Sequence, residues 1–198
     1  MTKYILNSGG IRNNPEGGKK FFAEMVRGLG IKPRILFCLF AYPRGDWEKK
    51  FIKTEEKVPE FYPKDVNPVF SLALPEIFEQ QIKDTDIVYI YGGDDHLLQY
   101  WLRKFKVPEI WQGKVVASNS AGSDALVRNF WASDWRKCMD GLGILPVKFF
   151  PHFRSAYGNL DPRGPIDWQK AHKELEEYGD KTLPIYALKE GEYVVIEQ

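Results

Sequence analysis

The chain has 198 residues, a length at which one domain can bury a large apolar core. Its 28 lysines and arginines nearly balance its 27 aspartates and glutamates, and no segment carries a sustained basic stripe. Neither a nucleic acid nor an anionic membrane is therefore an expected partner. Two cysteines, Cys38 and Cys138, are too few for a disulfide framework. Because we find no leader-like or membrane-spanning segment, we expect a cytoplasmic protein.

Short apolar runs alternate with amphipathic segments from the N-terminus onward. Four of these runs predict buried strands, at residues 4–6, 34–40, 69–72 and 86–91. Apolar spacing and capping residues predict helices between them, at residues 21–28, 47–51, 75–82 and 95–102. Apolar strands that alternate with helices are typical of an α/β fold, with a mostly parallel central sheet covered by helices on both faces.

Residues 114–126 are the segment on which the functional interpretation depends. They pass from β-branched residues through small residues into a helical composition, which predicts a strand, a tight turn at Ser120 and a helix. A serine at such a bend presents its hydroxyl outward, and N–H groups of the helix N-terminus point to the same place. A serine nucleophile needs a base, and His152 follows at a short distance in an aromatic run. The sequence therefore predicts a serine hydrolase.

The character of the chain changes after Pro151. Residues 159–165 form a turn-rich segment, and residues 172–178 predict a polar helix. Residues 183–187 and 193–196 are expected to pair as a small C-terminal hairpin around the turn at 189–192. We find no repeat and no linker, so residues 1–198 are expected to form a single domain.

Four motifs, taken together and in this order, resemble the S51 peptidase family: Tyr91–Asp95, Ser118–Gly122, Pro151–Phe153 and Ala187–Gly191. That family contains aspartyl dipeptidase and cyanophycinase. The resemblance covers nearly the whole chain and implies a flavodoxin-like three-layer sandwich. It also implies hydrolysis of small peptides that begin with aspartate, through a Ser-His-Asp/Glu triad. An acyl-enzyme is expected and no cofactor, and no His/Cys/Asp cluster in the sequence has the spacing of a metal site.

The resemblance also implies roles for individual residues. Ser120 is expected to be the nucleophile and His152 the general base. The backbone N–H of Gly93 is expected to stabilise the oxyanion, together with that of Ala121 at the start of the helix.

The acid of the triad and the substrate-binding residues depend on weaker signals. Asp134 lies between the serine and the histidine and is the expected third member; Asp140 is the rival, although a turn role suits it better. A small peptide presents carboxylates, which arginine binds bidentately, so Arg154 and Arg163 are the expected substrate-binding residues.

Two features depart from the family pattern. Ser118 stands where the family elbow usually has glycine, and Asp94 and Asp95 follow the two glycines where the family often has Asn-Thr. Two carboxylates near the site would disfavour an acidic substrate side chain. The alternatives are an esterase or acyl hydrolase with the same Ser-His pair, and a catalytically inactive protein that binds a small ligand. Either a monomer or a homodimer is expected.

Overall fold

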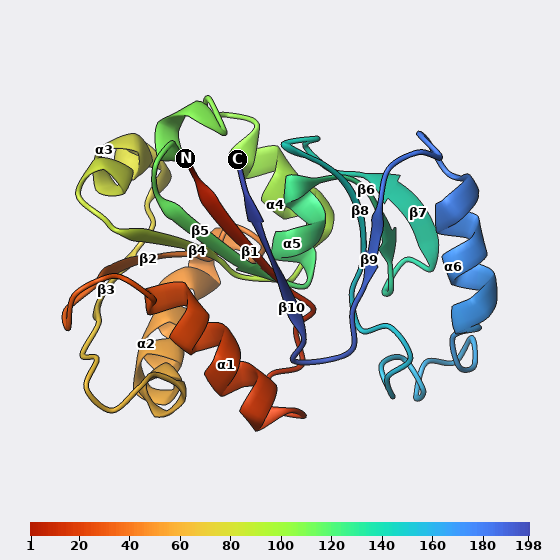
Figure 1. The fold of residues 1–198 in the computed structure, drawn as a ribbon, viewed down its shortest axis with the longest axis horizontal. Helices are drawn as coiled ribbons and strands as arrows, with labels where there is room; N and C mark the ends of the chain where they lie inside the picture. The colour runs from red at the N-terminus through yellow and green to blue at the C-terminus, as the bar shows by residue number, and fades with distance from the viewer.

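The predicted apolar runs lie in a six-stranded sheet at the centre of the fold (Figure 1). Its strands are β1 (Lys3–Asn7), β2 (Arg34–Cys38), β3 (Val69–Leu72), β4 (Ile87–Ile90), β5 (Val115–Asn119) and β10 (Tyr193–Glu197). The computed structural model, which describes residues 1–198, orders them β10-β1-β5-β4-β2-β3. All neighbours are parallel except β10, which pairs antiparallel with β1 at the edge.

Helices cover both faces of this sheet. Figure 1 shows α1 (Pro15–Val26) and α2 (Trp47–Lys57) on one side, and α3 (Phe78–Lys83), α4 (Asp95–Leu102) and α5 (Ala121–Leu126) on the other. Successive strand residues point to opposite faces, so Ile5 packs in the apolar cluster of α1 and Leu6 in that of α4 and α5. Burial on both faces requires continuous apolar strands. The expected α/β fold with a mostly parallel central sheet is therefore confirmed.

A second sheet lies beside the first, and the sequence pattern predicts little of it. Its strands are β6 (Val127–Ala132), β7 (Lys137–Asp140), β8 (Leu145–Phe150) and β9 (Ile185–Ala187), in the order β7-β6-β8-β9. Helix α6 (Trp168–Glu177) begins earlier than expected, because Asp167 caps it by accepting a hydrogen bond from the Lys170 N–H at 3.0 Å. Leu175 of this helix and Phe150 of β8 belong to the same buried apolar cluster.

The expected C-terminal hairpin is wrong. Strand β9 pairs with β8 in the second sheet, whereas β10 pairs with β1 in the first. The turn between them is held by the end of β1, since the Gly191 N–H donates to the Gly9 carbonyl at 2.8 Å and the Ser8 N–H donates to the Glu192 carbonyl at 3.0 Å. The segment 188–192 therefore links the two sheets, and it lies at the end of β1 (Figure 1).

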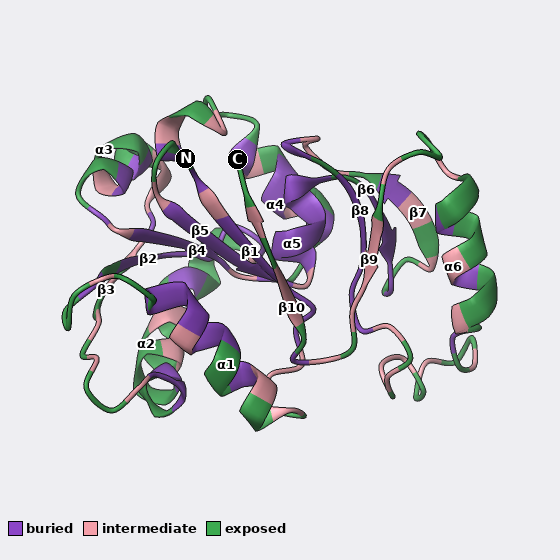
Figure 2. Cartoon of the chain, in the orientation of Figure 1, coloured by how far each residue is buried: buried purple, intermediate pink, exposed green.

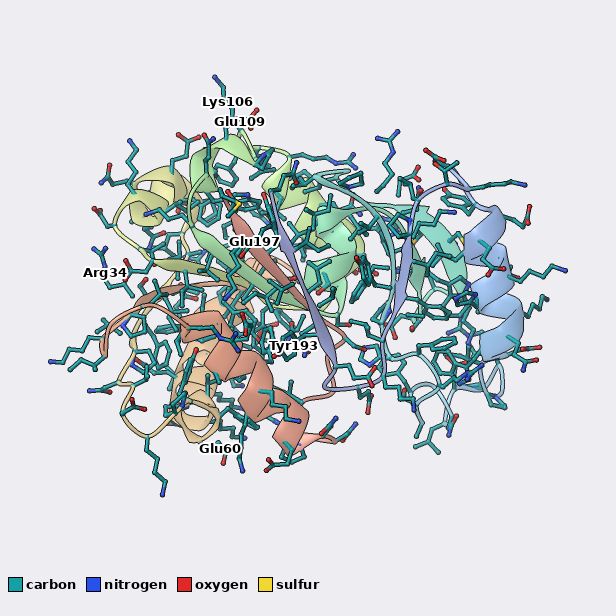
Figure 3. All side chains as sticks on the ribbon, viewed as in Figure 1. Arg34, Glu60, Lys106, Glu109, Tyr193 and Glu197 are labelled. Carbon is teal, nitrogen blue, oxygen red and sulfur yellow. The ribbon has the colours of Figure 1, made fainter.

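Burial differs sharply between the two helices that flank the second sheet. Helix α5, between the sheets, is buried along its whole length, whereas α6 exposes its outer face (Figure 2). Charged side chains of both signs point outward from the part of the molecule that contains the first sheet, among them Arg34, Glu60 and Lys106 (Figure 3). None of the helices combines the length and the hydropathy that crossing a membrane requires.

Candidate active site

Ser120 lies in a strained turn between β5 and α5. Its backbone has φ 48° and ψ −123°, a region that side-chain-bearing residues rarely adopt. A Cβ at Gly122 would lie 2.4 Å from the Ile90 carbonyl oxygen, so only glycine lets α5 approach the end of β4 this closely. Ser118 does not disturb the turn, because its hydroxyl is buried and lies 2.9 Å from the Ser123 hydroxyl. Ser120 therefore lies in a tight turn between a strand and a helix, which is the local structure that residues 114–126 predict.

His152 lies beside Ser120, with its Nε2 3.0 Å from the Ser120 Oγ. It follows β8 and adopts a positive φ of 57°, and its backbone N–H donates to the Ser8 hydroxyl at 2.6 Å. Only 6% of the residue is exposed, and this burial lowers the pKa of the imidazole although Glu190 acts to raise it. The ring is therefore neutral near pH 7 and able to accept a proton from Ser120.

Glu190, not Asp134, provides the carboxylate at the far side of the ring. Its Oε1 lies 3.2 Å from the His152 Nδ1, and its Oε2 accepts a hydrogen bond from the Asn13 Nδ2 at 2.7 Å. The Glu190 carbonyl also accepts from the Asn14 Nδ2 at 3.0 Å. A carboxylate at Nδ1 favours the tautomer in which Nε2 is free to accept the serine proton.

The structure places the two predicted acids elsewhere. Asp134 accepts a hydrogen bond from the Tyr157 hydroxyl at 2.7 Å, and the Tyr157 ring stacks on His152 with 4.0 Å between centroids. Asp134 therefore lies near the histidine without contacting its Nδ1. Asp140 accepts from the Asn129 side chain at 2.7 Å and is not part of this site.

The sequence around Glu190 predicts a turn and gives no local indication that this residue is the acid of the site. Glu190 belongs to the fourth family-like motif, and the family allows glutamate as the acid. The expected acid, Asp134, lies between the serine and the histidine in the sequence, whereas Glu190 follows both. The turn after β9 reaches the site only because β9 and β10 belong to different sheets.

The two expected oxyanion donors do lie beside Ser120. Gly93 and Ala121 line a small cavity together with the serine, and their backbone N–H groups donate no hydrogen bond within the protein. The neighbouring Gly92 N–H is already used, because it donates to the Asn119 Oδ1 at 2.6 Å. A Cβ at Gly93 would lie 2.8 Å from the Ala41 carbonyl oxygen, so this position requires glycine. Two unpaired donors next to a serine hydroxyl form an arrangement that can stabilise an oxyanion.

A groove of about 390 Å³ runs past the Ser120–His152 pair. Arg12 and Tyr42 are among the residues that line it. The predicted arginines line neither this groove nor the small cavity: Arg154 lies over the Phe153 ring, and Arg163 pairs with Asp161 at the surface. Arg12, which follows the glycines after β1, is therefore the arginine at the site. A larger depression of about 540 Å³ between α4 and β7 is lined by Asp140 but by no residue that contacts Ser120 or His152.

Gly9 provides a test of how closely the site is packed. A Cβ at this position, where φ is +86°, would lie 2.9 Å from the His152 Cε1 and 3.1 Å from the Ser120 Cβ. Gly9→Ala should displace the pair and lower kcat/KM by about 10²-fold. Gly28→Ala is the matched control, since Gly28 has φ +80° but no atom within 4 Å of its added Cβ. Both variants should lose a little stability, and steady-state kinetics should show an activity loss for Gly9→Ala alone.

Solved structures with a similar fold include two from bacteria. A peptidase from an acI-B1 Actinobacterium is 21% identical, with a TM-score of 0.62, and the match covers 99% of this chain and 83% of that one. A candidate peptidase E protein from Listeria monocytogenes EGD-e is 15% identical, with a TM-score of 0.61, and the match covers 100% and 99% of the two chains. No curated protein matches the sequence.

The family itself is identified by sequence. The profile described as peptidase family S51 matches residues 5–198, which span both sheets and every residue of the site described above. The resemblance inferred from the four motifs is therefore confirmed, and the chain belongs to peptidase family S51.

Proposed function

We propose that the chain is a serine peptidase that hydrolyses small peptides through an acyl-enzyme. The observation that carries the proposal is the continuous contact from the Ser120 Oγ through the His152 ring to the Glu190 carboxylate, with distances of 3.0 and 3.2 Å. In this arrangement Ser120 is the nucleophile, His152 the general base and Glu190 the group that orients the ring.

The reaction follows from the positions of these groups. As the Ser120 Oγ attacks the peptide carbonyl carbon, its proton passes to the His152 Nε2. The negative charge that develops on the carbonyl oxygen is stabilised by the free N–H groups of Gly93 and Ala121. His152 then protonates the leaving amine as the C–N bond breaks. A water molecule, deprotonated by the same ring, hydrolyses the acyl-enzyme.

The charges around the serine favour a short peptide but not an acidic one. Arg12 lies in the groove, where it can bind the carboxylate of a leaving residue. Two acidic residues, Asp95 and Asp124, are buried and line the small cavity beside Ser120. Burial raises the pKa of Asp95 to about 7, so this carboxyl group is partly charged near pH 7 and would repel an aspartyl side chain placed beside it. We therefore extend the proposal to small peptides in general and do not restrict it to aspartyl peptides.

The proposal is tested by labelling and by turnover. A fluorophosphonate that reacts with activated serines should modify Ser120, and peptide mapping should find Ser118 and Ser123 unmodified, because both are buried and hydrogen-bonded. Alanyl, leucyl and aspartyl dipeptides should be hydrolysed faster than the corresponding dipeptide amides, which lack the carboxylate that Arg12 would bind. No labelling and no turnover would reject a serine peptidase. Labelling with turnover of acyl esters alone would favour the esterase alternative.

A further inference from the structure

Ser8, the residue that follows β1, lies between the turn that carries His152 and the turn that carries Glu190. It is wholly buried, and its hydroxyl makes two hydrogen bonds. The hydroxyl accepts from the His152 backbone N–H at 2.6 Å and donates to the Leu188 carbonyl at 2.9 Å. The Ser8 backbone N–H donates to the Glu192 carbonyl at 3.0 Å. A single residue at the end of β1 therefore contacts both turns.

The backbone of His152 depends on the Ser8 hydroxyl. His152 has a φ of 57°, a region that side-chain-bearing residues adopt only when their surroundings hold them there. Its N–H has no acceptor other than the Ser8 Oγ, whereas the next N–H, that of Phe153, donates to the Leu188 carbonyl at 2.9 Å. A buried N–H without an acceptor is costly. Loss of the Ser8 hydroxyl should therefore let His152 leave this conformation.

The contact between the ring and the acid leaves little room for such a movement. The His152 Nδ1 lies 3.2 Å from the Glu190 Oε1, which is the long end of the range for a hydrogen bond of this kind. Glu190 has its own supports, because Asn13 donates to its carboxylate and Asn14 to its carbonyl. A change at Ser8 should therefore displace the ring more than the acid, and a shift of a few tenths of an ångström is enough to break the contact.

We propose that Ser8 is a positioning residue: its hydroxyl holds the His152 backbone in the conformation that places the imidazole between Ser120 and Glu190. Ser8 lines neither the groove nor the small cavity, so it acts through His152 and not through a substrate. The inference rests on the proposed function for its effect on the reaction. Its structural part, the contact of the ring with Glu190, can be measured without any turnover.

The pKa of His152 reports the placement of its ring. Burial lowers this pKa, and the charges of Glu190 and, less strongly, Asp134 raise it. The titratable and charged groups around the ring come from several elements: Glu190, Tyr157, Asp134, Asp95, Asp124 and Arg12. Among them, only Glu190 belongs to a turn that Ser8 contacts. Displacement of the ring from Glu190 should therefore lower the pKa of His152 further.

The first test is a histidine titration of the full chain by NMR, in which the His152 signals are assigned by their loss in His152→Gln. Ser8→Ala should lower the pKa of His152, and Ser8→Cys, whose thiol is a weak donor and acceptor, should lower it less. Thr85→Ala is the matched control. Thr85 is also buried, and its hydroxyl donates to the Arg34 and Ile87 carbonyls before β4, away from the site. This control should lower Tm and leave the pKa of His152 unchanged.

The second test is a double-mutant cycle with Glu190→Gln. In the wild-type background, Ser8→Ala should lower kcat for an alanyl dipeptide by about 10- to 100-fold and leave KM nearly unchanged, because the ring is misplaced and the groove is intact. In the Glu190→Gln background the same change should lower kcat by a smaller factor and should not lower the pKa of His152 further, because the contact with the carboxylate is already lost. Ser8→Cys replaces Ser8→Ala in the cycle if the alanine variant fails to fold.

Three results would overturn the proposal. An unchanged pKa of His152 in a folded Ser8 variant would show that the ring does not depend on the hydroxyl. A raised pKa would show that the hydroxyl keeps the ring buried and does not hold it against Glu190. An equal fall of the pKa with and without the Glu190 carboxylate would show that Ser8 acts by another route.

The titration also separates this proposal from the proposed function. A lowered pKa in Ser8→Ala, together with no labelling of Ser120 by a fluorophosphonate, would keep the positioning role and reject the peptidase. Labelling of Ser120 together with an unchanged pKa would keep the peptidase and reject the positioning role alone.

Discussion

Replacement of Ser120 by alanine is expected to lower kcat for peptide hydrolysis by about four to six orders of magnitude while leaving the fold intact. The hydroxyl lies 3.0 Å from the His152 Nε2, and alanine removes the only atom placed to attack the carbonyl. The oxyanion donors of Gly93 and Ala121 are backbone groups and remain, so a small residual rate is expected. Single-turnover kinetics measure the loss, and circular dichroism confirms the fold. A variant with wild-type turnover would contradict the nucleophile assignment.

Ser120→Gly gives the matched comparison. Alanine keeps a Cβ in the strained backbone at φ 48° and ψ −123°, whereas glycine adopts this region without strain. Relief of about 1–2 kcal/mol of strain should therefore make Ser120→Gly more stable than Ser120→Ala. In a chain of this size, each kcal/mol raises Tm by about 2–4 °C. Equal Tm values, measured by differential scanning calorimetry, would show that the turn is not strained.

The elbow and the histidine could be predicted because their signals are local. Small residues after an apolar strand require a tight turn at Ser120, and the helix that follows supplies free N–H groups in any fold. His152 was the only histidine that followed the elbow at a strand end. The structure brings the two within hydrogen-bond distance, and their roles remain proposals.

Glu190 could not be found in the same way because its position depends on the topology. A turn between two apolar runs has the same local pattern whether the runs pair with each other or join different sheets. In this fold β9 adds to β8 and β10 adds to β1, so the turn crosses the carboxyl ends of both sheets. Asn7 helps to fix it there by donating to the Glu192 carbonyl at 3.2 Å. The sequence does not predict strands β6 and β7, because polar residues interrupt their apolar pattern.

Glu190→Gln is expected to lower kcat by about 10²- to 10⁴-fold and to move the acid limb of the pH profile to lower pH. The glutamine no longer favours the tautomer with Nε2 free, which accounts for the loss of rate. The shift of the acid limb follows from opposing effects on the pKa of His152. Burial lowers this pKa, and the Glu190 charge raises it. Without that charge the pKa falls further. Because the neutral ring is the active form, activity persists to lower pH.

The pH profile of kcat/KM measures this shift and separates Glu190 from its neighbours. In the wild-type chain the acid limb should lie below the ordinary histidine value of about 6.5, since the pKa of His152 is lowered by burial. Glu192→Gln is the matched control: this residue lies in the same turn, but it accepts from the Lys189 N–H and does not contact His152. Glu192→Gln should keep the wild-type pH profile.

Asp134→Asn retains an acceptor for the Tyr157 hydroxyl and should lose less activity than Glu190→Gln. The Asp134 charge also raises the pKa of His152, but Glu190 does so more strongly, so the acid limb should move less in Asp134→Asn than in Glu190→Gln. The reverse order in both the rate and the acid limb would return the role of the triad acid to Asp134.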